Sequence, residues 1–403
     1  MLSQQKSLFY FRRSFSALFC PSRISGHLSG FLRAWGRQNH HPFRGASYHR
    51  YIQKCFFNRW GRSKVKFNWE VLELRLKETF RISRGELDAK KIVVARIGEG
   101  MGEASPSSYY NESWETVLDY FKIIQGKIGN EFDVEELVAT FKREHQGFNQ
   151  AARAALDMAL LDWQGKIKGM PVYKLLGLSG EIKVPISHTI GIDTLEKMQE
   201  KALRAKEFEI LKVKVGVPAD MEMVKAVREV TDKRIRVDAN AGWKTEEAIQ
   251  KINQLEDLGV EFVEQPLKPE NKEGLKEIRK NTFLPIILDE PICTSGDIPQ
   301  WAGLCEGINI KLMKSGGITE ALNMIKLARS LGMKVMLGCM IESSLGITAA
   351  AQLASEADYL DLDSHLLIEN DPFTGLGFKE GKLILSQRLG LGVEFKSELT
   401  NKI

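Results

Sequence analysis

Five charged residues follow apolar runs at nearly equal intervals in the second half of the chain. The steps from Lys214 to Asp238, Glu264, Asp289 and Lys311 are 24, 26, 25 and 22 residues. Each run is rich in Ile, Leu and Val, as in strands that are covered on both faces. One strand and its following helix take about that length. We therefore expect these residues on successive parallel strands, at the mouth of a barrel, where active sites lie.

Three of the five residues are carboxylates. Asp238, Glu264 and Asp289 would repel one another at a barrel mouth unless a cation neutralised them. Oxygen ligands of this kind favour Mg²⁺ or Mn²⁺ over zinc. The alternative is that each carboxylate is the separate salt-bridge partner of a lysine or an arginine. We expect these three residues to bind one Mg²⁺ ion in each subunit.

The stretch EILKVKVG, residues 209–216, carries two lysines on one face of a predicted strand. A free lysine has a pKa of about 10.4, but nearby ammonium groups and a divalent cation make its neutral form accessible. We expect Lys212 to lower the pKa of Lys214 and to bind a substrate carboxylate. Lys214 and Lys311 would then act as bases on opposite sides of the substrate. This arrangement favours 1,1-proton transfer at the α-carbon of a carboxylate, through an enediolate and with inversion.

The elements that position these residues follow from the pattern of the whole chain. From residue 182 to residue 363, short apolar runs alternate with polar stretches long enough for one helix. This alternation indicates a parallel (β/α)8 barrel, or a variant that lacks one helix. Residues 64–180 instead indicate an α+β region. Its predicted elements are strands at 64–77 and 90–104 and helices at Ser113–Ile128, Val134–His145 and 149–167.

The positive charge of the chain is concentrated in residues 1–64, which contain twelve Lys or Arg residues and no Asp or Glu. The whole chain has 57 basic and 52 acidic residues, so the remainder has 57 − 12 = 45 against 52, a net charge of about −7. We expect this leader to result from a misassigned start or, second, to be an organellar transit peptide, whose composition it resembles. An arm that binds nucleic acid or membrane is the remaining alternative. We expect no nucleic-acid or membrane partner for the folded part.

The composition also indicates in which cellular compartment the protein is expected. No window of 18 apolar residues indicates a transmembrane helix. The five cysteines are odd in number and form no CxxC pair, so neither a disulfide framework nor a thiolate metal site is expected. We expect a reducing compartment, the cytoplasm, or an organelle if the transit peptide is genuine.

The motifs around these residues resemble those of the enolase superfamily, in the muconate lactonising subgroup. They are KVK (Lys212–Lys214), DANAGW (Asp238–Trp243), EQPL (Glu264–Leu267), DEP (Asp289–Pro291) and NIKLMKSGG (Asn309–Gly317). The resemblance covers residues 65–396. It implies Mg²⁺-assisted chemistry with Lys214 and Lys311 as the bases. It matches the family's lysine in the last motif to Lys311, so Lys314 is expected on the surface.

The resemblance also implies the domain organisation. An α+β capping domain is expected at residues 65–180 and a (β/α)7β barrel, TIM-like, at residues 181–363. Residues 364–403 would return to the cap, and the leader, residues 1–64, has no counterpart in the family. A homo-oligomer is expected.

The sequence YLDLDS places Asp361 and Asp363 on one face at the end of the eighth predicted strand. Two carboxylates without an evident cation of their own suit a substrate ammonium group. The pair resembles that of the dipeptide epimerases, which implies inversion of the C-terminal residue of a dipeptide. Other enzymes of the subgroup, such as o-succinylbenzoate synthase, N-succinylamino acid racemase and cycloisomerase, are alternatives. The remaining alternatives are a helix-capping Asp pair and a non-catalytic scaffold protein.

Substrate preference is expected to depend on the cap. Residues Thr79–Gly85 resemble a cap loop that closes over the substrate. In it, Arg84 or Arg81 would pair with an acidic side chain, which favours a murein-derived, L-Ala-D/L-Glu-like dipeptide. We expect Arg84 in this role, and a surface arginine is the alternative. Thr189 and Cys339 match positions that line the family's pocket, and Glu342 matches an acidic position from which it would orient Lys311.

Overall fold

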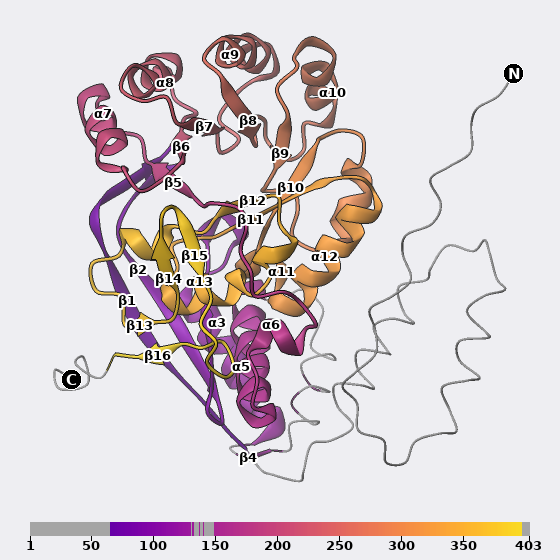
Figure 1. The fold of residues 1–403 in the computed structure, drawn as a ribbon. Helices are drawn as coiled ribbons and strands as arrows, with labels where there is room; N and C mark the ends of the chain where they lie inside the picture. The colour runs from indigo at the N-terminus through magenta and orange to yellow at the C-terminus, as the bar shows by residue number, and fades with distance from the viewer. Residues whose placement is uncertain (1–64, 130, 133–136, 138–139, 141–148, 397–403) are drawn as a thin grey trace, which may run out of the picture. The chain divides into compact units, whose positions relative to one another are not determined.

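The computed structural model describes residues 65–129, 131–132, 137, 140 and 149–396. Within these residues the chain forms an antiparallel sheet with helices, then a barrel of parallel strands, then a C-terminal segment (Figure 1). The basic leader lies outside the described residues, and so does nearly all of the helix predicted at Val134–His145. In the part of the chain that the structure describes, no helix is both long enough and apolar enough to cross a membrane.

The N-terminal sheet has the order β3-β2-β1-β4 with antiparallel pairing. Its strands are β1 (Val65–Ile82), β2 (Gly85–Ile97), β3 (Gly100–Ala104) and β4 (Glu131–Phe132). The single strand predicted at 90–104 is wrong, because the chain reverses there and forms a hairpin. Gly98 permits the turn with a φ of 57°, a backbone conformation that glycine adopts without strain.

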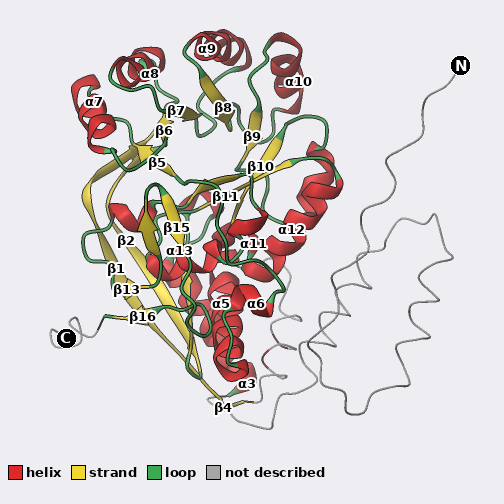
Figure 2. Cartoon of the chain, viewed as in Figure 1, coloured by secondary structure: helices red, strands yellow, loops and turns green. Residues whose placement is uncertain are grey.

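Helices α3 (Trp114–Ile128) and α5 (Gln150–Lys168) pack against this sheet, and Figure 2 shows them in red beside the yellow strands. The same part of the chain also contains the 3-10 turn η1 (Ser108–Tyr110) and helix α6 (Val172–Leu175). Helix α3 begins with a capping box in which Ser113 and Thr116 satisfy each other's backbone N–H groups. Helix α5 lies directly on β3. At Gly102 a Cβ atom would come 2.0 Å from the carbonyl oxygen of Ala155, so the close approach requires glycine.

Eight parallel strands then form the barrel, in the order of the chain. They are β5 (Ser187–Ile190), β6 (Ile210–Lys214), β7 (Arg234–Asp238), β8 (Val260–Glu264), β9 (Ile286–Leu288), β10 (Gly307–Lys311), β11 (Lys334–Gly338) and β12 (Tyr359–Asp361). A bridge between Ile186 and Leu360 joins the last strand to the start of the first. Figure 1 shows the helices of the first four connections outside the strands.

Seven connections join the eight barrel strands, and no barrel helix follows the last strand, β12, among the described residues. The helices are α7 (Leu195–Arg204), α8 (Asp220–Glu229), α9 (Thr245–Asp257), α10 (Lys272–Asn281), α11 (Leu312–Ser315), α12 (Ile318–Ser330) and α13 (Ser344–Ala351). The chain enters the barrel directly at β5 and leaves it after β12, and the 3-10 helix η2 (Ser295–Trp301) joins β9 to β10. The prediction of a TIM-like (β/α)7β barrel with an α+β cap is confirmed.

After β12 the chain runs back along the N-terminal sheet and α5. The segment contains η4 (Ser364–Leu367), β13 (Phe373–Thr374), β14 (Gly377–Lys379), β15 (Lys382–Ile384) and β16 (Glu394–Phe395). The N–H of Glu369 donates to the carbonyl oxygen of Arg75 over 2.8 Å, and the N–H of Leu391 donates to Asp162 Oδ1 over 2.7 Å. The first and last parts of the described chain are therefore joined beside the barrel.

The contact between β3 and α5 generates a stability prediction. We expect Gly102→Ala to lower the free energy of unfolding by about 1–3 kcal/mol, the usual cost of overpacking, because the added Cβ forces the helix away from the strand. Urea unfolding measures this loss. The control is Gly126→Ala in α3, where a Cβ meets nothing within 4 Å. That change should be neutral or stabilise by about 0.5–1 kcal/mol, since alanine favours helix. Equal effects of the two changes would contradict the packing argument.

Candidate active site

The five charged residues that recur along the sequence lie together at the carboxyl ends of the barrel strands. Lys214, Asp238, Glu264 and Lys311 are the last residues of β6, β7, β8 and β10, and Asp289 follows β9 directly. The register places Lys214 opposite Asp238, and Asp238 opposite Glu264. Hydrogen bonding between parallel neighbours therefore holds three of them at one height, and all five are buried.

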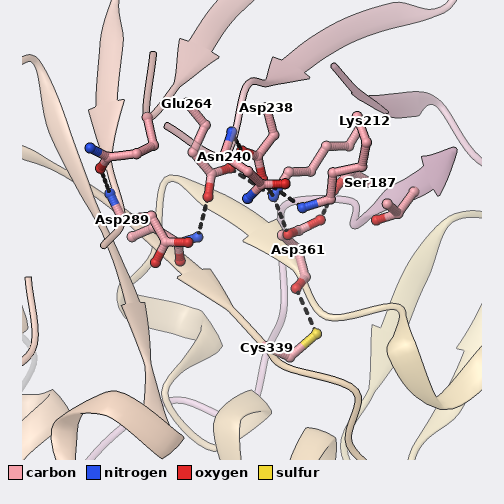
Figure 3. Close-up of polar contacts among 12 residues, drawn as sticks. Ser187, Lys212, Asp238, Asn240, Glu264, Asp289, Cys339 and Asp361 are labelled. Carbon is pink, nitrogen blue, oxygen red and sulfur yellow. Dashed lines mark hydrogen bonds and ion pairs between the residues drawn. The ribbon is translucent and has the colours of Figure 1, made fainter. Parts of the chain in front are cut away.

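Lysine ammonium groups lie between the carboxylates, and Figure 3 shows part of this network. Lys212 Nζ is 2.7 Å from Glu264 Oε2, 3.1 Å from Asp238 Oδ2 and 2.6 Å from Asp361 Oδ2. Lys214 Nζ lies 2.6 Å from Asp238 Oδ2. Across the mouth, Lys311 Nζ lies 2.8 Å from Asp289 Oδ2.

The ionisation of these groups follows from burial and from their neighbours. Burial alone would raise the pKa of Asp238, but the charges of Lys214 and Lys212 outweigh it and lower that pKa. Burial and the charge of Asp238 together raise the pKa of Glu264 to about 7. Burial would lower the pKa of Lys212, but the charges of Asp361, Glu264 and Asp238 raise it well above its ordinary value. Lys212 is thus a permanent cation in this arrangement.

The expected contact of Lys212 with a substrate carboxylate stays a prediction. Its side chain is 1% exposed, it makes its contacts with three carboxylates of the protein, and it is not among the residues that line the cavity described below. Two lysines two residues apart on one strand therefore differ in depth. Lys214 reaches the cavity wall, whereas Lys212 lies beneath it.

The donor chemistry of Asp238, Glu264 and Asp289 fits a hard divalent cation. They are three buried carboxylates on neighbouring strands, and oxygen donors of this kind suit Mg²⁺. Among the described residues, no three carboxylate, histidine or cysteine groups lie at the mutual spacing of metal ligands. Lysine ammonium groups neutralise the three carboxylates in this structure. A divalent cation can neutralise these carboxylates in place of the lysines. The three residue types therefore fit Mg²⁺.

A cavity of about 410 Å³ lies between the cap and the barrel mouth. Lys214 and Lys311 line it from β6 and β10, which lie four strands apart in the barrel. The barrel also contributes Thr189, Cys339, Asp361 and Asp363, and the cap contributes Phe80, Ile82, Arg84, Lys90 and Tyr109. A molecule in this cavity would contact both parts of the chain at once.

The cap is fastened to the loop that follows β11. Ser105 Oγ donates to the carbonyl oxygen of Ile341 over 2.6 Å, and the N–H of Ser343 donates to Glu103 Oε1 over 3.0 Å. Ile341 lines the cavity. Glu342 is buried, its Oε1 accepts the N–H of Met340 over 2.7 Å, and burial and Glu103 raise its pKa to about 8. Its role in orienting Lys311 stays a prediction.

The prediction that Asp361 and Asp363 have no cation of their own is wrong for Asp361. Lys212 pairs with Asp361 Oδ2, and Ser187 Oγ donates to Asp361 Oδ1 over 2.7 Å. The sequence separates Lys212 from Asp361 by 149 residues, so no local pattern indicates this pair.

Asp363 has a different environment, because no lysine or arginine contacts it among the described ion pairs. It accepts the N–H of Thr189 over 2.6 Å and the Thr189 hydroxyl over 3.2 Å. Burial and the charge of Asp361 raise its pKa to about 7. Thr189 therefore lines the cavity and fixes Asp363, and the Cys339 thiol donates to the Asp361 carbonyl oxygen over 3.2 Å.

Arg84 reaches the barrel mouth from the cap loop, as expected, but its charge already has a partner. Its Nη1 lies 2.6 Å from Glu290 Oε1 and donates to the carbonyl oxygen of Asn240 over 2.9 Å. Its guanidinium group lies over the Tyr109 ring, 4.4 Å from the centroid. The side chain of Glu290 is 1% exposed. An acidic substrate group would therefore share Arg84 with Glu290.

The prediction that Lys314 lies on the surface is wrong. Lys314 is 2% exposed, and its Nζ lies 2.5 Å from Asp289 Oδ1 and 3.1 Å from the carbonyl oxygen of Asn309. The reason is the short helix α11, which begins directly after β10 and turns the side chain back toward β9. The spacing of three residues from Lys311 to Lys314 is compatible with this turn, but it does not by itself distinguish a buried lysine from an exposed one.

The fold and this site define a class of enzyme: capped parallel barrels with carboxylates and lysines at the strand ends. Two family descriptions match the chain, "Mandelate racemase / muconate lactonizing enzyme, N-terminal domain" over residues 70–177 and "Enolase C-terminal domain-like" over residues 195–399. The chain belongs to this family, the mandelate racemase and muconate lactonizing branch of the enolase superfamily.

Within this family, the chain is similar to enzymes with the names of dipeptide epimerases. The L-Ala-D/L-Glu epimerase of Bacteroides thetaiotaomicron is 38% identical over 337 residues, 82% of this chain and 88% of that protein. The substrate-liganded L-Ala-D/L-Glu epimerase from Bacillus subtilis has a TM-score of 0.77 and 29% identity, over 82% of this chain and 98% of that one. The dipeptide epimerase from Enterococcus faecalis V583, complexed with Mg and L-Leu-L-Tyr, has a TM-score of 0.76 and 33% identity, over 82% and 99%.

The carboxylate cluster generates a prediction about metal removal. We expect Asp238→Asn to weaken Mg²⁺ binding at least about tenfold, because the amide removes one negative charge from the site. Titration calorimetry of the protein with MgCl₂ measures the change. The control is Asp220→Asn, which alters a buried carboxylate of the same barrel that is paired with Trp243 and Lys251. Unchanged affinity in Asp238→Asn would contradict the ligand assignment, as would an equal loss in the control.

Proposed function

We propose that the protein is a dipeptide epimerase that inverts the α-carbon of the C-terminal residue of a dipeptide. The observation that carries the proposal is that Lys214 and Lys311 line one cavity from two sides of the barrel, while Asp361 and Asp363 line it as well. Two bases on two sides suit removal of a proton from one face and its return to the other. Relatives with the names of dipeptide epimerases support this choice within the family.

In the proposed reaction each group has one role. Asp361 and Asp363 accept hydrogen bonds from the free ammonium group of the dipeptide, which places its C-terminal α-carbon between Lys214 and Lys311. Asp238, Glu264 and Asp289 hold Mg²⁺. When bound, the ion supplies positive charge beside the substrate carboxylate, where negative charge grows as the α-proton leaves.

The lysines then move the proton. The neutral amine of one lysine accepts the α-proton from its face, and the ammonium group of the other donates a proton to the opposite face. The product has the inverted configuration, and the two lysines have exchanged protonation states. Lys212 remains a buried cation between Glu264, Asp238 and Asp361, where it compensates their charge. The cap excludes water from the α-carbon during this exchange.

For the side chain of the C-terminal residue we propose an acidic preference of the L-Ala-D/L-Glu type. Arg84 and Lys90 are the cations that the cap presents to the cavity. The apolar side chains of Phe80, Ile82 and Leu87 line the same wall, and Arg84 is shared with Glu290. These last two features favour the second candidate, an epimerase of hydrophobic dipeptides. Assembly into a homo-oligomer and a cytoplasmic location stay predictions.

The proposal predicts discrimination between free and blocked dipeptides. With Mg²⁺ present, we expect the protein to epimerise L-Ala-L-Glu and to lose about 100-fold or more in kcat/KM on N-acetyl-L-Ala-L-Glu, because the acetyl group removes the ammonium charge that Asp361 and Asp363 would bind. Chiral chromatography measures both rates. L-Leu-L-Tyr, processed faster than L-Ala-L-Glu, would replace the acidic preference with a hydrophobic one. Turnover of the N-acylated compound alone would sink the dipeptide proposal and favour an N-succinylamino acid racemase.

A further inference from the structure

The three carboxylates assigned to Mg²⁺ share one geometric feature. Each has one oxygen that accepts a hydrogen bond from a group other than Lys212, Lys214 and Lys311. The pairs are Asp238 Oδ1 with the N–H of Asn240 at 2.9 Å, Glu264 Oε1 with Asn309 Nδ2 at 2.8 Å and Asp289 Oδ1 with Lys314 Nζ at 2.5 Å. The second oxygen of each carboxylate faces Lys212, Lys214 or Lys311 instead.

Lys314 differs from the other three lysines of this cluster. It comes from α11, not from a strand, and it is not among the residues that line the cavity between cap and barrel. Its ammonium group donates to Asp289 Oδ1, to the Asp289 carbonyl oxygen and to the Asn309 carbonyl oxygen. An ammonium group has three N–H donors. These three acceptors therefore use its full capacity, and they fix it against the ends of β9 and β10.

Asn309 extends this support to the neighbouring strand. Its side chain holds Glu264 Oε1, while its carbonyl oxygen accepts from Lys314. Lys314 and Asn309 together thus fix one oxygen of two carboxylates whose other oxygens face Lys311 and Lys212. A carboxylate with one oxygen fixed presents its other oxygen in a single direction, which lowers the cost of ordering it around an ion.

We propose that Lys314 is a positioning residue of the metal centre, which holds Asp289 by Oδ1 and leaves Oδ2 to the ion. The inference rests on the proposed assignment of Asp238, Glu264 and Asp289 as ligands. Two effects oppose each other at this position. The charge of Lys314 repels a cation, whereas its hydrogen bonds orient the ligand, and loss of such outer support typically costs 10–100-fold in metal affinity. The buried geometry, with all three donors satisfied, favours orientation as the larger effect.

Two substitutions separate orientation from charge. Lys314→Met shortens the side chain by one atom and removes both the charge and the donors. Lys314→Gln gives a side chain of the same length as methionine and also removes the charge, but it keeps an N–H donor for Asp289. Orientation predicts that Met weakens Mg²⁺ binding about 10–100-fold and that Gln restores part of the loss. A purely electrostatic role predicts that both substitutions tighten binding equally.

The experiment is titration calorimetry of the full chain with MgCl₂ in the absence of any dipeptide, with Mn²⁺ paramagnetic resonance as a second probe. The control is Asp157→Asn, which alters a carboxylate that accepts hydrogen bonds from the N–H and the hydroxyl of Thr319 in the first turn of α12, without contact to the three ligands. Thermal unfolding of each variant reports on folding. We expect Asp157→Asn to lose stability but to keep the Mg²⁺ affinity of the unchanged chain.

The outcomes distinguish this inference from the proposed function, because no substrate is present. Weaker binding in Lys314→Met with partial recovery in Lys314→Gln supports the inference, whatever the dipeptide assays show. Equal or tighter binding in both variants overturns it. An unchanged chain that binds no Mg²⁺ overturns it together with the metal assignment. If Lys314→Met does not fold, Lys314→Gln decides alone. A Mg²⁺ affinity equal to that of the original sequence overturns the inference, and a tenfold weaker affinity supports it.

Discussion

Charge compensation at the buried end of the barrel is the constraint on which the rest of this structure depends. Four lysines meet four carboxylates there, namely Lys212, Lys214, Lys311 and Lys314 with Asp238, Glu264, Asp289 and Asp361. A buried charge without a partner costs several kcal/mol, so this cluster is stable only because every member has a partner. The same balance makes the cluster responsive, because a dication or a substrate anion changes which partner each lysine faces.

The fold supplies the geometry that this compensation requires. Parallel strands end at one level, so a charged residue after each apolar run necessarily meets the charged residues of the neighbouring strands. The cap then covers the mouth and contributes Arg84 and Tyr109 to the cavity wall. Hydrogen bonds from Ser105 and Ser343 fasten the cap to the loop after β11. The cluster therefore lies between the barrel interior on one side and the cavity under the cap on the other.

Much of this arrangement could be predicted from the sequence because it depends on period and register. The steps of 22 to 26 residues place the five charged residues at one height without knowledge of any contact. The pairs that the sequence did not reveal are those between distant or differently folded segments. Arg84 and Glu290 are 206 residues apart. Lys314 lies in a helix of four residues, which is too short for a sequence pattern to predict. The hairpin at Gly98 was not predicted because only Gly98 and Glu99 separate β2 from β3.

The central claim is that Lys214 and Lys311 act on opposite faces of the same α-carbon. The most direct test follows α-proton exchange in D₂O by Lys214→Ala and by Lys311→Ala, each supplied separately with the L,L and L,D epimers of the same dipeptide and Mg²⁺, with mass spectrometry as the readout. The account predicts that each variant exchanges the α-proton of one epimer only, that the two variants select opposite epimers, and that neither inverts the centre. Equal loss of exchange from both epimers in both variants would contradict it.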